Sequence, residues 1–235
     1  MRKLVEVVEL TKLMMLEWKK LNRSLVIGEM AIYLGILMIL PPFFIHSIIP
    51  YFSESYALAI ELNSFIQLGV ILFGASLINH VFIEEYKSKT MALSFGYPIT
   101  RRKLFIAKIL FIAFVVFIIT LFSSLLSSIV IVTVDQFIPI INGQPTFNDM
   151  ITFITAMIST AFKATIITFI PLFLFGIWKR AVFPTIICAI VVMQLPNFSS
   201  FINVQQDTLI VVFCILGGLS ILLSIVSAEK LGEIK

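Results

Sequence analysis

The sequence has few charged residues and little cysteine, and both shortages narrow what the protein can be. Only 13% of its 235 residues are charged, whereas 60% are hydrophobic. No soluble fold of this size could hide so much apolar surface, so a membrane protein is expected. The two cysteines, Cys188 and Cys214, both lie inside apolar runs, where a free cysteine behaves as a small hydrophobe. Neither a disulfide framework nor a cysteine metal site is therefore expected.

The sequence also lacks the motifs of common enzymes. It contains no H-E-x-x-H pair for zinc and no G-x-x-x-x-G-K-[ST] loop for nucleotide phosphates. We find no paired carboxylates at helical spacing within one span and no Ser/His/Asp set that the topology could bring together. His46 and His80 are expected too far apart to share an ion. We therefore expect no catalytic residue, metal or cofactor in this chain, and its energy must come from an ion gradient or another polypeptide.

Long apolar runs dominate the chain. A helix needs about 20 apolar residues to cross the roughly 30 Å hydrocarbon core. Because helices satisfy every backbone polar group internally, the sequence predicts an all-α membrane protein. Six spans are expected, the fifth of them short, at residues 25–49, 62–83, 104–134, 150–177, 181–195 and 208–227.

Positive charge is missing from one side of these spans. Of the 17 Lys and Arg residues, 16 lie before the first span, between Glu84 and Lys108, after the fourth span, or at the end of the chain. The other connections, 50–61, 135–149 and 196–207, carry acidic residues but no Lys or Arg. The positive-inside rule places the basic segments, and with six spans both termini, in the cytoplasm. Membrane orientation thus accounts for the net charge of +4, and nucleic-acid binding is not expected.

Residues 1–24 predict an amphipathic helix that lies in the membrane interface. Charges continue to Arg23, so a cleavable signal peptide is not expected. Trp18 is expected at headgroup depth, with the basic residues toward anionic lipid. A plain anchor that extends the first span is the alternative to a helix that transmits force. The expected apolar face comprises Leu4, Val7, Val8, Leu10, Met14, Met15, Trp18 and Leu21, and the charged face Arg2, Glu6, Glu9, Lys12, Glu17, Lys19, Lys20 and Arg23.

Glu29 and Lys163 are the two candidates for an ionisable residue at mid-membrane depth, where ion coupling usually leaves several. Glu29 lies about one turn inside the first span, so its carboxylate can reach toward the cytoplasmic interface. Lys163 lies near the middle of the fourth span, where an isolated ammonium is costly. We expect Lys163 to line a translocation path, or to brace helices by pairing with Glu29 or with a second subunit.

The connection at 84–103 predicts a helix, a stop and a second helix. Gly96 suits a helix C-terminal cap and Pro98 cannot continue a helix, so a short helix is expected from about Lys87 to Phe95. Thr100 can cap the third span, whose basic first turns, extending to Lys108, are expected at lipid phosphates. The short helix presents an apolar side that needs a covering surface, which is typical of a docking element.

A family resemblance follows from these residues. The pattern E-Y-x-S-x-T at 85–90, then Y-P-I-T-R-R-K at 97–103 and a lysine at Lys108, resembles the permease subunits of bacterial type-2 ABC exporters. Those commonly show E-x-x-x-G-T, then P-[IV]-[ST]-R and a downstream lysine. The resemblance extends to the whole topology, but Lys89 stands where that family usually has glycine.

The resemblance implies a coupling helix that seats in a groove of a separate ATP-binding subunit, where ATP and magnesium would bind. Two permeases, identical or related, would then move between inward-facing and outward-facing states. Glu85 would tie the coupling helix to a neighbouring basic group. The residues expected to make the contact are Lys89, Thr90, Met91, Ala92, Leu93, Ser94 and Phe95.

The segment at 196–207 is expected to turn back into the outer leaflet, because the fifth span is too short to cross unaided. Phe198 and Phe201 would then plug the pathway as an outer gate. An ordinary loop after a tilted helix is the alternative.

Substrate is inferred from composition and resemblance. The 23 Phe and nine Met residues suit an amphipathic or hydrophobic cargo, although they also suit ordinary lipid-facing surface. The small size resembles permeases that handle antimicrobial or toxin peptides, which favours peptide export or self-protection over export of drugs, lipids or polysaccharide. A substrate-binding membrane component of an uptake transporter and a non-transporting scaffold remain as alternatives.

Overall fold

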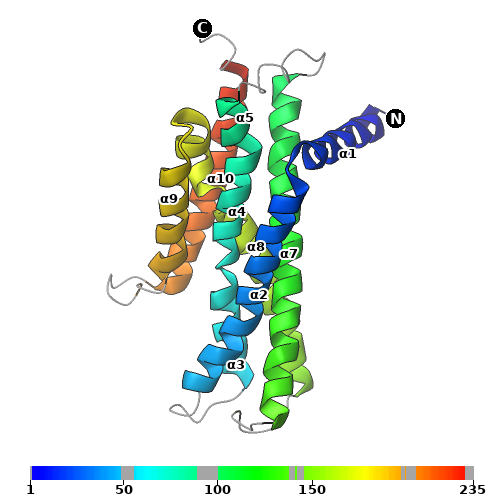
Figure 1. Cartoon of the computed structure of the whole chain (residues 1–235). Helices are drawn as coiled ribbons and strands as arrows, with labels where there is room; N and C mark the ends of the chain where they lie inside the picture. The colour runs from blue at the N-terminus through cyan, green and yellow to red at the C-terminus, as the bar shows by residue number, and fades with distance from the viewer. Residues whose placement is uncertain are drawn as a thin grey trace.

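The computed structural model describes residues 2–48, 56–88, 100–137, 141, 146–196, 199 and 205–230, and the regular elements of these ranges are all helical. This confirms the prediction of an all-α membrane protein (Figure 1). In chain order the elements are α1 (Arg2–Lys20), α2 (Arg23–Ile48), α3 (Tyr56–Gln67), α4 (Val70–Ile78), the π-helix η2 (Asn79–Ile83), α5 (Glu84–Lys87), α7 (Arg101–Phe137), α8 (Phe147–Ile167), the π-helix η3 (Leu172–Trp178), α9 (Val182–Gln194) and α10 (Gln206–Lys230).

The helices that could cross a membrane can be compared with the six predicted runs. Within the described residues, five helical stretches are long and apolar enough to cross a membrane: Arg23–Ile45, Tyr56–Lys87, Arg101–Phe137, Phe147–Ile167 and Gln206–Ala228. α9 has 13 residues, so at 1.5 Å per residue it extends about 20 Å. The expected fourth span is divided between α8 and η3, because Pro171 has no N–H to offer the carbonyl of Ile167, where α8 ends.

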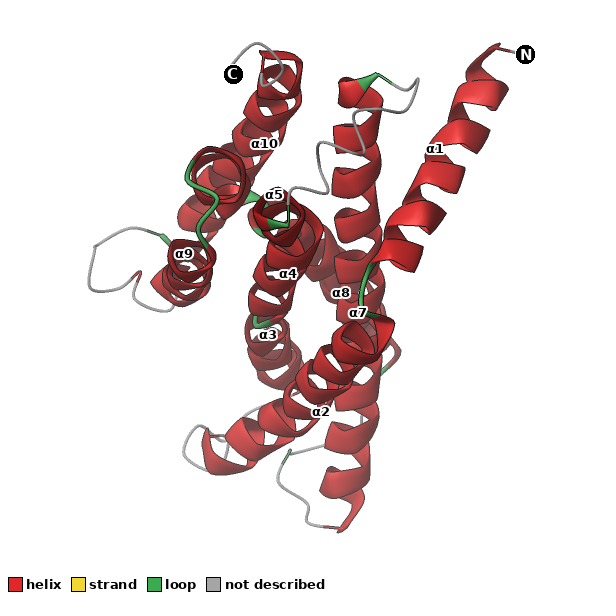
Figure 2. Cartoon of the chain, turned by 45° about the horizontal axis from the view of Figure 1, so that its top comes forward, coloured by secondary structure: helices red, strands yellow, loops and turns green. Residues whose placement is uncertain are grey.

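The second span, which runs from α3 through α4 and η2 to α5, is the most deeply buried of the five. α4 packs against α2, α7, α8 and α9, and it occupies the middle of the bundle (Figure 2). Phe73, Leu77 and Ile78 of α4 are completely buried. Because close-packed interiors transmit strain, a displacement at one end of this span is expected to move the helices packed against it.

A buried polar network surrounds a break in the second span. α3 ends at Gln67, and a turn at Leu68 and Gly69 precedes α4. The Gln67 amide nitrogen donates to the Leu37 carbonyl at 3.2 Å, and its amide oxygen accepts from Ser123 at 2.5 Å. These bonds join α2, α3 and α7 where lipid offers no hydrogen-bonding partner.

The start of α1, the end of α10 and all of α5 lie at the same end of the bundle (Figure 1). α1 changes direction from α2 at Leu21 and Asn22 and packs against α7. Trp18 of α1 lies with its ring centroid 6.2 Å from that of Phe111 on α7. The helix at 2–20 is thus anchored to the third span and is more than an extension of the first.

Two adjacent glycines of α10 provide a matched test of how closely the helices approach. A Cβ at Gly217 would lie 2.2 Å from the backbone oxygen of Ile166 on α8, whereas a Cβ at Gly218 would meet nothing within 4 Å. We expect Gly217→Ala to lower the free energy of unfolding by about 1–3 kcal/mol, because α8 and α10 must separate. Gly218→Ala should leave it unchanged or slightly raised, since alanine favours helix. Thermal unfolding of both variants in detergent compares them, and equal midpoints would contradict the close approach.

Candidate functional site

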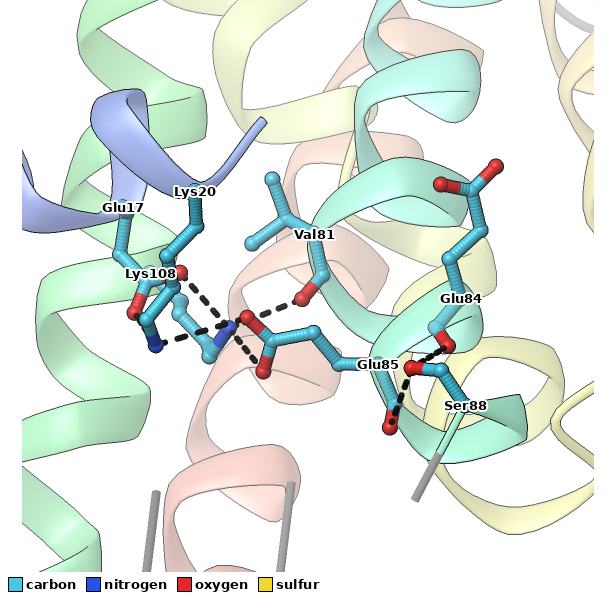
Figure 3. A network of polar contacts seen from close by, with 7 residues as sticks. All are labelled: Glu17, Lys20, Val81, Glu84, Glu85, Ser88 and Lys108. Carbon is cyan, nitrogen blue, oxygen red and sulfur yellow. Dashed lines mark hydrogen bonds and ion pairs between the residues drawn. The ribbon is translucent and has the colours of Figure 1, made fainter. Parts of the chain in front are cut away.

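Lys108 is the centre of a charged cluster at the end of the bundle that contains α5. It lies about two turns into α7 and is completely buried. Its Nζ atom lies 2.8 Å from Glu17 Oε2 on α1 and 2.9 Å from Glu85 Oε2 on α5, and it donates a hydrogen bond to the Val81 carbonyl at 2.9 Å (Figure 3). An ammonium has three N–H groups. Two of them are used in the hydrogen bonds to Glu17 and Val81, and Glu85 completes a set of three oxygen atoms from three different elements around the ammonium.

The two carboxylates also share Lys20, so the cluster contains two acidic and two basic side chains. Lys20 Nζ lies 3.0 Å from Glu17 Oε1 and 3.6 Å from Glu85 Oε1. Burial by itself would lower the pKa of Lys20, but the two carboxylates outweigh burial and raise this pKa above its usual value. The contact between Lys108 and Glu85 has the distance of an ion pair but not the alignment of a hydrogen bond. The cluster is thus electrically balanced, as burial of charge requires.

This burial corrects two predictions from the sequence. Glu17 was expected on the water-facing side of the N-terminal helix and Lys108 at lipid phosphates. Instead Glu17 is 2% exposed and Lys108 is 0% exposed, because each neutralises the other inside the protein. Leu13, four residues before Glu17, is also buried, so both face α7. Leu13 is apolar but does not belong to the apolar face predicted from the sequence, and this mismatch was the available signal for the orientation.

Glu29 and His80 form a second polar cluster beside the first. The Ser76 hydroxyl donates to Glu29 Oε2 at 2.7 Å, while His80 Nε2 lies 3.2 Å from Glu29 Oε1 and His80 Nδ1 lies 3.0 Å from Glu84 Oε1. Glu29 was expected to reach toward the interface by itself, and its contacts with Ser76 and His80 were not predicted. Ser76 and His80 are one helical turn apart on the second span, which is the spacing that could have shown it.

Neither cluster has the geometry of a catalytic or metal site. The Ser76 proton is directed at a carboxylate and not at His80, so these residues do not form a serine–histidine pair. The two ring nitrogens of His80 face different carboxylates, Glu29 and Glu84. Across the described ranges, no three His, Cys, Asp or Glu side chains are arranged to hold a metal ion.

A third contact reaches the end of the second span from the turn between η3 and α9. Arg180 in this turn has φ of 52°, in the left-handed region that few non-glycine residues adopt. Its guanidinium lies 4.3 Å from the ring centroid of Tyr86, a cation–π contact. Residues 80–86, which we call the junction segment, thus receive polar contacts from α1, α2, α7 and this turn.

The junction segment leads directly to the expected coupling helix. α5 ends at Lys87, and Ser88 closes the helix by donating from both its N–H and its hydroxyl to the Glu84 carbonyl, at 2.9 and 2.8 Å. Of the residues expected to contact an ATP-binding subunit or to brace that contact, Glu85 is described. Residues 89–99, and with them Lys89 to Phe95, lie outside the described part of the chain.

The other expected functional residues are dispersed. Lys163 of α8 is partly buried and makes no ion pair or hydrogen bond with any residue that the structure describes, so it is not brought to Glu29. Phe198 and Phe201, the expected outer gate, lie outside the described residues, as does most of the expected re-entrant segment at 196–207. The polar network of Gln67 was not predicted from the sequence.

Comparison with known proteins agrees with the fold and the resemblance. Residues 24–230 match a family described as ABC-2 family transporter protein. The chain is 32% identical over 139 residues to the uncharacterized protein YcbO of Bacillus subtilis (strain 168), an alignment that covers 59% of this chain and 60% of that protein. No solved structure matches it. Since the family match covers most of its length, this multi-pass membrane chain belongs to the ABC-2 transporter family.

Proposed function

We propose that this chain is the membrane-spanning permease subunit of an ATP-driven exporter. It works with a second permease, identical or related, and with separate ATP-binding subunits on which ATP and magnesium bind. The chain itself catalyses no reaction. Both termini and the junction segment face the cytoplasm, in keeping with the one-sided distribution of Lys and Arg.

The junction segment is the observation that carries this proposal. It immediately precedes the expected coupling helix, and the Lys108 cluster ties it to α1 and α7 while Glu29 ties it to α2. Polar contacts buried in apolar surroundings are costly to break, so these elements tend to move together. A displacement of residues 89–99 by the partner subunit is therefore transmitted to α1, α2 and α7.

The energy for such a push comes from a ligand that binds two conformations with different affinity. ATP on the partner subunits supplies this difference, because their closure around the nucleotide displaces the grooves in which the two coupling helices sit. Within this chain the displacement reaches the second span, which is central and firmly packed. Rigid-body movement of packed helices is the ordinary way in which such a displacement opens one side of a membrane protein and closes the other.

Hydrophobic or amphipathic molecules, with antimicrobial or toxin peptides foremost, are the proposed cargo. The adaptable Phe-rich and Met-rich composition supports this class. Drugs, lipids and polysaccharide are the competing cargoes. A substrate-binding component of an uptake transporter is the competing function, but it does not account for a braced junction that leads into the expected coupling helix.

The test is coexpression with candidate ATP-binding subunits, followed by purification and measurement of ATP hydrolysis and export. Met91→Glu and Phe95→Glu should weaken the complex and uncouple hydrolysis from export, because each places a charge where an apolar contact is expected. Phe137→Glu is the matched control, since Phe137 is 86% exposed at the far end of α7. If both coupling variants retain a stable complex and full export, the coupling assignment is wrong.

A further inference from the structure

A cavity of about 450 Å³ lies between α3, α7 and α8, at the end of the bundle opposite the Lys108 cluster. Its walls are largely apolar, with Ile60, Val132, Met150 and Phe153 among them. Cavities of this size and character are typical of small-molecule sites, in which a few polar groups orient an apolar body. The polar groups here indicate what the ligand is.

Asn63 supplies an unused hydrogen-bond donor to this cavity. The side chain lines the cavity, yet the residue is only 3% exposed. Its amide orientation is fixed by a chain of bonds, because the Leu37 carbonyl requires a donor and so holds the Gln67 nitrogen, which in turn donates to Asn63 Oδ1 at 3.2 Å. Ser127 also donates to Oδ1, at 2.7 Å.

The Asn63 nitrogen, Nδ2, is consequently left without a partner among the described protein atoms. An amide donor that opens on a largely apolar cavity without an acceptor is costly, by an amount comparable to a lost hydrogen bond. A ligand carbonyl in the cavity would satisfy it, whereas a hydrocarbon chain would not.

The charge around the cavity is negative. Asp149 of α8 lines it, with Oδ2 accepting hydrogen bonds from the Thr146 N–H at 2.9 Å and hydroxyl at 2.7 Å. Asp135 lies nearby on α7 and accepts a hydrogen bond of 2.8 Å from Tyr56, which also lines the cavity. The connections 50–61 and 135–149 contain no Lys or Arg. The field at this end therefore favours a cation and disfavours an anionic lipid headgroup.

We propose that this cavity binds an amphipathic cation that carries a carbonyl group, as a basic peptide does. The apolar body fills the space between α3, α7 and α8, a carbonyl accepts from Asn63 Nδ2, and the cationic group lies near Asp149. The inference deepens the proposed function, on which it rests for the role of the ligand as cargo, whereas binding itself needs no ATP-binding partner.

Three probes distinguish the contribution of the cationic group from that of the carbonyl group. Their binding is measured with the purified chain reconstituted in phosphatidylcholine nanodiscs. L-phenylalanyl-L-arginine β-naphthylamide has both the cation and the carbonyls, N-acetyl-L-phenylalanine β-naphthylamide has carbonyls without the cation, and tetraphenylphosphonium is a cation without a carbonyl. We expect the first to bind at least tenfold more tightly than either of the others, and its affinity to fall as salt is added.

Two pairs of variants locate the site. Asp149→Asn should weaken the dipeptide amide about fivefold, whereas Asp207→Asn, a matched change in the first turn of α10, should have no effect. Val132→Trp should fill the cavity and abolish binding, whereas Ile129→Trp, on an exposed surface of the same helix, should not. Thermal unfolding verifies that all four variants are folded.

Equal binding of the three probes, or equal effects of Asp149→Asn and Asp207→Asn, would overturn the proposal, as would phospholipid retained in the cavity and not displaced by the dipeptide amide.

The outcome of this binding test is independent of the coupling test. Binding as expected, together with intact coupling in the Met91 and Phe95 variants, would reject the coupling assignment alone. Loss of coupling without any binding would reject the site alone.

Discussion

Lys108→Met is expected to lower the free energy of unfolding by about 3–5 kcal/mol and to abolish export. The substitution leaves Glu17 and Glu85 in place without their buried partner, and an uncompensated buried charge costs this much. The effect on function follows because α1, α5 and α7 are no longer joined at the junction segment. Chemical unfolding in detergent and export from proteoliposomes measure the two losses.

A triple variant distinguishes the charge imbalance from a simple loss of packing. Adding Glu17→Gln and Glu85→Gln to Lys108→Met removes the uncompensated charges, so stability should be largely recovered. Lys12→Met, on the exposed side of α1, controls for removal of a lysine and should change stability by less than about 0.5 kcal/mol. If Lys108→Met behaves like Lys12→Met, the cluster does not hold these helices together.

Lys163→Leu should make the protein more stable, in contrast to Lys108→Met, but it should also abolish export. Lys163 lies near the midpoint of the stretch from 147 to 178 formed by α8 and η3, and it has no ion pair with the described residues. Replacing a lysine at the centre of a span by leucine favours membrane insertion by about 2.5–3.5 kcal/mol. A charge kept at this cost is expected to serve the translocation path or contact a second permease.

Lys179→Leu is the matched control, because Lys179 is exposed at the end of η3, where a lysine costs little. Insertion efficiency, crosslinking of the two permeases and export are measured for both variants. Full export and normal assembly by Lys163→Leu would reject both roles proposed for this lysine.

The fold was predictable to the extent that it depends on length and composition. Runs of apolar residues predict helices in a membrane, and the 13 residues of α9 agree with the expectation of a short fifth span. The break after Gln67 was not predicted, because a hydropathy average over a long apolar run is little changed by one glutamine. The hydrogen bonds of this glutamine to α2 and α7 depend on the tertiary structure. The division of the fourth span could have been read from Pro171.

The candidate site was less predictable, since its contacts join residues that are remote in sequence. Lys108 is 91 residues from Glu17, and Ser76 is 47 residues from Glu29. Helical periodicity reports which side of one helix is apolar but not which charge on another helix will meet it. The motif that carried the family resemblance contains both Glu85 and Lys108, so it named two members of the cluster without giving their geometry.

The Lys108 cluster also has a consequence for biosynthesis. A chain made at roughly 5–20 residues per second presents Glu17 about 5–18 s before Lys108, and Glu85 a few seconds before it. Both carboxylates have therefore already been synthesised, and lie at the membrane surface, when Lys108 emerges within the third span. The ammonium enters a site whose counterions are already in place, so the order of translation avoids the costly intermediate of an unaccompanied lysine in lipid.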